Sequence, residues 1–179
     1  MSNLKPILLK LDKTRRELLR AADQVPAGHW QTAPSEGRWS AGGVIGHLTM
    51  VERYVLSSAD RISRTEPKRW PFYRRFHLPF AMVERRLIKR KAPQRVEPEA
   101  LGSKEEMLAE FREVRERTLA FLDETKSRDL SAYRWPHPFI GTLNVYEWLL
   151  FVGSHEVRHT KQMREIVDAL PKSVASSRN

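Results

Sequence analysis

The sequence contains no cysteine. This absence excludes a disulfide framework, a thiolate nucleophile, a zinc ribbon and an iron–sulfur cluster, so any metal ion must be bound by histidine and carboxylate side chains. Chemistry that needs a thiol must therefore take it from another molecule. Long apolar runs are also missing, because the longest, from Trp148 to Val152, is far shorter than the about 18 residues of a membrane span. Basic residues interrupt the N-terminal leucines and break up any signal-peptide core, so we expect a soluble, cytoplasmic protein.

Apolar and polar residues do not alternate with a period of two over enough residues to predict a strand. Apolar residues instead recur at three- and four-residue steps, the period of an amphipathic helix. Four long helices are predicted at about 4–24, 40–64, 104–126 and 144–170, with a shorter one near 80–91. Ser40, Ser103 and Asn144 are suited to N-caps, and Ser103 and Asn144 each precede a glutamate by three residues, as in a capping box. The sequence therefore predicts an all-α four-helix bundle with a long crossover between the second and third helices.

A chain of 179 residues is long enough for one domain with a sizeable core. We expect a single domain at 1–170, a basic crossover at 66–101, and a disordered tail of small and polar residues at 171–179. The formal net charge of +10 belongs to one segment, because 61–95 carries 12 Lys or Arg and only two acids. The rest of the chain is neutral, so the high charge is a property of the crossover and not of the helical scaffold.

Three histidines are predicted to share the bundle interior. His155 and His159 lie four residues apart on the last helix, which places two imidazoles on one face. His47 lies three residues after Val44 and four before Val51, on the apolar stripe of the second helix. Bundle cores are where such folds build metal sites, and three imidazoles with an open fourth position are typical of catalytic zinc.

An ordinary buried histidine bonded to a backbone carbonyl is the alternative for each of these residues. That alternative requires each of three buried imidazoles in one interior to have its own hydrogen-bond partner. We therefore favour a shared metal ion. The other three histidines lie in predicted loops beside proline or aromatic residues, where a structural role is expected: His29, His77 and His137.

The segment from His155 to His159 also matches the H-E-x-x-H pattern of zinc proteases, in which the glutamate is the general base. The downstream ligands that such proteases add are missing, since Gln162 and Glu165 occupy the positions where one class has glycine and histidine. No sheet is predicted whose edge would bind a peptide. We therefore reject a protease and expect the third ligand upstream, at His47.

Two further polar residues are candidate catalytic residues. Glu156 lies about 60° around the helix from His159 and is placed to act as a base beside the metal, although a supporting or surface glutamate has the same pattern. Gln162, one turn beyond His159, is placed to orient a ligand or the substrate, or else is a polar residue at the edge of the stripe. Glu52 is interpreted as a surface or supporting carboxylate paired with Arg53 or Arg158.

Over roughly 4–170 the chain resembles the DinB/YfiT-like superfamily of metal-binding four-helix bundles. The resemblance rests on Arg38-Trp39-Ser40, on His47-Leu48 with Glu52 five residues after the histidine, on Gly141-Thr142-Leu143, and on His155-Glu156-x-x-His159-x-x-Gln162. It implies an up-down-down-up bundle, frequent dimers, and one divalent ion, often zinc or nickel, on His47, His155 and His159. Relatives with known activity are transferases or isomerases that use bacillithiol, mycothiol or glutathione, and in them the metal lowers the pKa of the thiol.

The resemblance therefore implies a metal-dependent S-transferase or isomerase with a low-molecular-weight thiol as cosubstrate. One rival is a metal-dependent hydrolase with Glu156 as base. The other is a nucleic-acid or membrane-binding module that uses 61–95, where the stretch Trp70 to Phe80 mixes aromatic and cationic residues. The same stretch is also interpreted as a lid that attracts an anionic cosubstrate, or as a solvated crossover whose aromatics cap the bundle. Among partners we favour a small, anionic molecule and a second copy of the chain.

Overall fold

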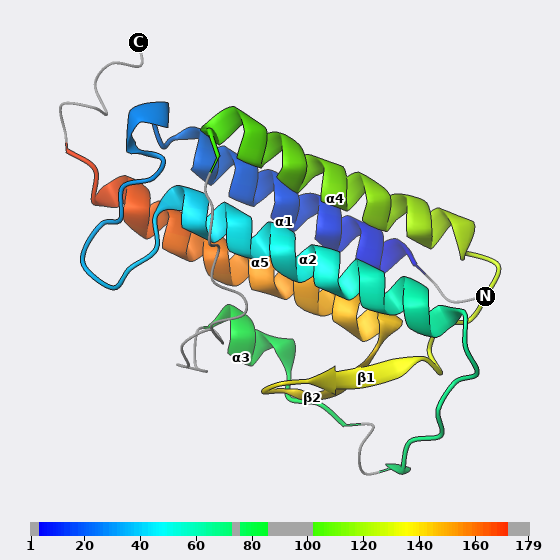
Figure 1. The fold of residues 1–179 in the computed structure, drawn as a ribbon. Helices are drawn as coiled ribbons and strands as arrows, with labels where there is room; N and C mark the ends of the chain where they lie inside the picture. The colour runs from blue at the N-terminus through cyan, green and yellow to red at the C-terminus, as the bar shows by residue number, and fades with distance from the viewer. Residues whose placement is uncertain (1–3, 73–75, 86–101, 172–179) are drawn as a thin grey trace.

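The fold consists of four long helices packed side by side. A computed structural model describes residues 4–72, 76–85 and 102–171 (Figure 1). The long helices are α1 (Lys5–Asp23), α2 (Ala41–Ser63), α4 (Lys104–Glu124) and α5 (Val145–Asp168). Shorter elements are the 3-10 turn Ala27–His29, helix α3 (Phe80–Glu84) and the strands β1 (Arg134–His137) and β2 (Gly141–Asn144).

The starts of three helices are set by the predicted caps. The Ser40 hydroxyl accepts a hydrogen bond from the Gly43 N–H at 3.0 Å and begins α2. Ser103 with Glu106, and Asn144 with Glu147, form complete capping boxes at the starts of α4 and α5. Each box satisfies backbone N–H groups that would otherwise have no partner at the end of a helix. The capping predictions are confirmed.

The long helices follow the up-down-down-up order. In Figure 1, α2 and α4 run in the same direction, and α1 and α5 run in the opposite one. Two helices that run in the same direction need a connection about as long as the bundle, which explains the extended crossover after α2. Helix α3 confirms the first part of the short helix predicted near 80–91, and the remainder lies outside the described residues. The expected tail also lies outside them, apart from Pro171.

Within the described residues, a β-hairpin is added to the predicted architecture. The sequence predicts no strand, whereas β1 pairs antiparallel with β2, with Arg134 opposite Asn144 and His137 opposite Gly141. Each strand has only four residues and β1 contains Pro136, so the pattern is too short to be recognised. Gly141 has φ +113°, and a Cβ there would lie 2.7 Å from the backbone oxygen of Phe76. Glycine thus lets residues 76–77 of the crossover approach β2 closely, and His77 forms an antiparallel bridge with Gly141.

The bundle interior has two apolar clusters with polar side chains between them. The cluster at the hairpin end includes Trp135 and Trp148, whose rings stack at 4.9 Å. The cluster at the opposite end includes Trp30, Phe111 and Met163. Along each long helix, buried polar residues separate the two clusters. Within the described ranges, no helix combines the length and the apolar composition that crossing a bilayer requires.

Candidate metal centre

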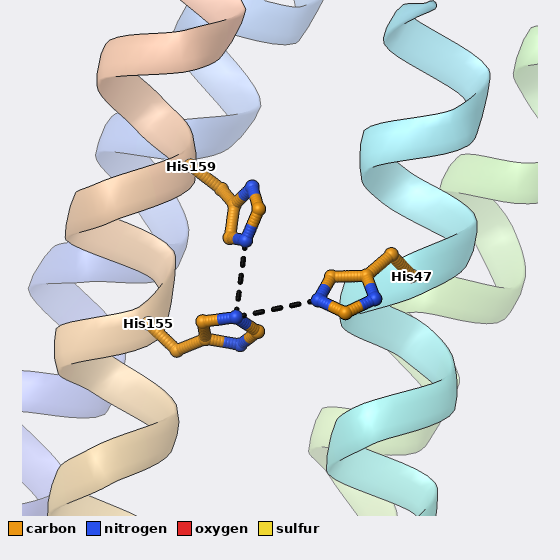
Figure 2. A group of neighbouring side chains, drawn as sticks. All are labelled: His47, His155 and His159. Atoms are coloured by element: carbon orange, nitrogen blue, oxygen red, sulfur yellow. Dashed lines mark hydrogen bonds between the residues drawn. The ribbon is translucent and has the colours of Figure 1, made fainter. Parts of the chain in front are cut away.

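The three predicted histidines lie together in the polar layer between α2 and α5. His155 and His159 project from α5 toward α2, and His47 projects from α2 toward them (Figure 2). The Nε2 atoms of His47 and His155 lie 3.3 Å apart, and those of His159 and His155 lie 3.0 Å apart. His47 and His159 are buried, and His155 is partly exposed.

This geometry fits one small divalent ion. Zinc binds imidazole nitrogen at about 2.0–2.1 Å, and two nitrogens of a tetrahedral site then lie about 3.3–3.4 Å apart. The Nε2 separations of 3.0 and 3.3 Å are close to this value. Three neutral imidazoles in such contact cannot all donate to one another, so a shared cation satisfies their lone pairs better than hydrogen bonds between them.

The electrostatic environment favours the neutral form of His155. Burial, followed by the neighbouring imidazoles of His159 and His47, lowers the pKa of His155 well below its ordinary value. A metal ligand must be the neutral form of imidazole, since the coordinating nitrogen needs a free lone pair. The interior therefore favours the form of His155 that can bind a cation.

Aromatic rings hold the imidazoles in place. The ring of Trp39 is stacked on that of His159, with the ring centroids 6.1 Å apart. The centroids of the Trp39 and His47 rings lie 4.7 Å apart. Phe151 stacks on His155 at 5.2 Å. Neither aromatic residue is predicted from the sequence to have a role at the site, although Phe151 precedes His155 by the four residues that bring side chains together on a helix.

Gln162 contacts a predicted ligand directly. Its Oε1 atom lies 2.9 Å from Nδ1 of His159, the ring nitrogen that faces away from the other histidines. An amide oxygen can only accept, so Nδ1 carries the proton and Nε2 is left free for a metal. Of the two functional alternatives for Gln162, this placement favours the orientation of a ligand.

Replacement of Gln162 by leucine should weaken metal binding by about 10- to 100-fold, the usual effect of removing such a supporting partner. The change leaves all three histidines in place but no longer fixes the tautomer of His159. Competition with a chromophoric chelator measures the affinity. Gln24→Leu, at an exposed position just beyond α1, is the matched control and should bind as the wild type does. Equal affinity of Gln162→Leu and the wild type would show that the contact has no effect on binding.

The Glu156 carboxylate does not lie at the centre, and its predicted role as the base is not supported by its contacts. Its Oε2 atom accepts from the Thr14 hydroxyl at 2.6 Å, and its Oε1 atom accepts from Arg15 at 2.8 Å and from Arg115 at 3.1 Å. The 60° that separates Glu156 from His159 turns this side chain toward α1 and α4, away from α2.

Of the alternatives for Glu52, the surface position is wrong, and so are the two expected partners. The side chain is buried, and it bonds to Arg115 and Arg15 instead of Arg53 or Arg158. Arg53 pairs with Glu110 on the surface at 2.6 Å. The partners of Glu52 are on helices far away in the sequence, and no local spacing identifies them.

His137 lies near the triad without being one of its ligands. Its ring contacts Phe151 at 4.5 Å, and its Nδ1 atom accepts from the Phe139 N–H at 3.1 Å. Burial lowers the pKa of His137 to about 4, so this imidazole is neutral near pH 7. The expected structural role is consistent with these contacts.

The described part of the basic segment 61–95 is largely exposed. Phe72 and Phe76 contact each other at 5.1 Å and are 74% and 64% exposed. Two lysines hold the end of helix α3 near the triad. Lys161 donates a hydrogen bond to the backbone oxygen of Glu84 at 2.8 Å, and Lys10 forms an ion pair with the Glu84 carboxylate at 2.7 Å. Many of the arginines of this segment lie outside the described residues, including Arg74, Arg75 and Arg86.

Comparison with known proteins agrees with this architecture. The model of the DinB superfamily matches residues 10–163. The uncharacterized protein YuaE of Bacillus subtilis (strain 168) is 31% identical over 141 residues, which cover 78% of this chain and 84% of the relative. The crystal structure of TT2238, a four-helix bundle protein, matches with a TM-score of 0.58 at 21% identity and covers 91% of this chain and 99% of that chain.

Proposed function

The chain belongs to the DinB superfamily, and from this premise we propose that it is a divalent-metal-dependent S-transferase or isomerase that activates a low-molecular-weight thiol. The observation that carries the proposal is the convergence of the Nε2 atoms of His47, His155 and His159 from two helices. Zinc or nickel is the proposed ion, because imidazole nitrogen suits both. Such an ion, when bound, lowers the pKa of a coordinated thiol so that it reacts as a thiolate.

The absence of cysteine supports the use of an external thiol, since the chain has no sulfur nucleophile of its own. Arg158, which lies on α5 between the two ligands of that helix, supports an anionic cosubstrate. Its positive charge acts on His155 from nearby, and the residue is only partly buried. Biological low-molecular-weight thiols carry carboxylates, and a cation beside the metal centre would attract them.

The rival hydrolase is less well supported. It assigns the role of base to Glu156, and this carboxylate is bonded to Arg15, Arg115 and Thr14 instead. The three histidines themselves are committed to the ion and supply no base.

Thiol binding to the metal-loaded protein tests the proposal. Protein without a histidine tag is loaded with Co²⁺ and titrated with glutathione, bacillithiol or mycothiol, and S-methylglutathione serves as the matched control because it has no free thiol. We expect one thiol to change the Co²⁺ absorption and to raise the melting temperature, since a ligand at 100 times its Kd adds about 2.7 kcal/mol. The S-methyl compound should leave the absorption unchanged. Equal responses to thiol and thioether, or turnover of an ester without any thiol, would contradict the proposal.

A further inference from the structure

Four buried charged side chains form a cluster beside the metal centre. They are one residue from each long helix, and we call them the charge quartet: Arg15, Glu52, Arg115 and Glu156. Each side chain is at most 7% exposed. Two guanidiniums and two carboxylates balance each other, so the quartet has no net charge.

Each arginine of the quartet bonds to both carboxylates. Arg15 contacts Glu52 and donates to Glu156 at 2.8 Å. Arg115 donates to Glu52 at 2.7 Å and to Glu156 at 3.1 Å. Arg115 also donates to the backbone oxygen of Leu11 at 2.7 Å. These directional bonds give every buried charge a partner, as burial of ions requires.

The quartet connects the two pairs of helices that supply the metal ligands. In the bundle, α1 packs mainly along α5, and α2 packs mainly along α4. His47 belongs to the second pair, whereas His155 and His159 belong to the first. The Arg15–Glu52 and Arg115–Glu156 bonds both cross from one pair to the other. The position of His47 relative to the other two ligands therefore depends on contacts of this kind.

The quartet also lies at nearly the same height in the bundle as the triad. Glu156 directly follows His155 and precedes His159 by three residues, and Glu52 follows His47 by five. A shift of α2 against α5 by one residue amounts to about 1.5 Å, whereas ligand distances in a metal site are held to about 0.2 Å. Apolar contacts are not directional and do not define the register this closely.

We propose that the charge quartet is the positioning device of the metal centre, which holds α2 against α5 in the register that brings His47 to His155 and His159. Its link to catalysis rests on the proposed function, although the register itself does not. The four residues are positioning residues and touch neither the ion nor a substrate.

The first experiment exchanges one ion pair of the quartet for apolar residues. The double variant Glu52→Leu/Arg115→Met removes both ion pairs that cross between the helix pairs. It leaves Arg15 paired with Glu156 and bonded to the backbone oxygen of Phe111. Exchange of a buried ion pair for apolar side chains of similar volume is often neutral or stabilising, so this variant is expected to fold. The matched control is Arg53→Met/Glu110→Leu, which makes the same exchange at the exposed pair on the same two helices.

Co²⁺ titration provides the functional readout. We expect the quartet variant to bind Co²⁺ at least tenfold more weakly than the wild type and with an altered visible spectrum, while its melting temperature without metal stays near that of the wild type. The control should match the wild type in affinity and spectrum. A purely structural role would change the melting temperature and leave the affinity of the folded protein intact, and that result would overturn the proposal.

A second readout does not depend on metal binding. Because the chain has no cysteine, spin labels attach only at Ser57→Cys on α2 and Arg164→Cys on α5, both of which are exposed. Pulsed electron paramagnetic resonance should give one narrow distance distribution for the labelled parent and the control, and a broader or shifted one for the quartet variant. Identical distributions overturn the proposal. If no chain binds Co²⁺ but the distributions differ, the proposed function fails and the positioning role stands.

Discussion

Replacement of His47 or His159 by alanine is expected to abolish stoichiometric metal binding. The wild type should retain close to one divalent ion per chain after dialysis, and each variant should retain almost none. Each change removes one of three converging Nε2 atoms and leaves two ligands, which is too few to hold the ion against water. Loss of a partner that only supports a ligand costs about 10- to 100-fold in affinity, so loss of a ligand should exceed 100-fold.

Elemental analysis of protein purified without a histidine tag measures the metal content, and calorimetric titration with Zn²⁺ and Ni²⁺ measures the affinities. His29→Ala is the control, because this residue lies on the 3-10 turn Ala27–His29 outside the triad. It should bind as the wild type does. Retention of a full equivalent of metal by His47→Ala would mean that the ion is bound elsewhere or by α5 alone, and the centre described above would then be wrong.

The convergence of the three histidines could be predicted from the sequence because their positions follow from helical periodicity. Val44 and Val51 identify the inward stripe of α2, and the spacing of His155 and His159 places both on one face of α5. The capping residues Ser40, Ser103 and Asn144 similarly act within one turn of chain. Features that depend on residues close in sequence are therefore recovered well.

The quartet could not be predicted because its pairs join residues far apart in sequence. Arg15 and Glu156 are separated by 141 residues, and Arg115 and Glu52 by 63. Charged residues on a helix usually face solvent, so local spacing gives no reason to pair these four side chains with one another in the interior. Only the packing of the helices shows that the two arginines and the two glutamates are buried together and neutralise each other's charge. The β-hairpin was missed for a different reason, since tertiary contacts and not strand propensity stabilise its two short strands.

Truncation of Glu156 to alanine is expected to destabilise the fold strongly, even without metal. The change removes the shared acceptor of Arg15 and Arg115 and leaves two buried cations with the single carboxylate of Glu52. Breaking a buried ion pair in this way costs about 3–5 kcal/mol, a large part of the about 5–15 kcal/mol that stabilises a typical domain. At about 2–4 °C per kcal/mol for a domain of this size, the melting temperature should fall by roughly 6–20 °C.

Burial acts to raise the pKa of the remaining carboxyl, Glu52, but the guanidiniums of Arg115 and Arg15 outweigh it and hold that pKa below its usual value. Glu52 therefore stays ionised at neutral pH, and the loss in Glu156→Ala comes from uncompensated positive charge. Urea unfolding followed by circular dichroism, with a chelator present, measures the change in the free energy of unfolding. Glu110→Ala breaks an exposed pair with Arg53 and should cost less than about 1 kcal/mol. If Glu156→Ala costs no more than this control, the quartet contributes no paired charge to the folded state, and its bonds cannot hold α2 and α5 in register.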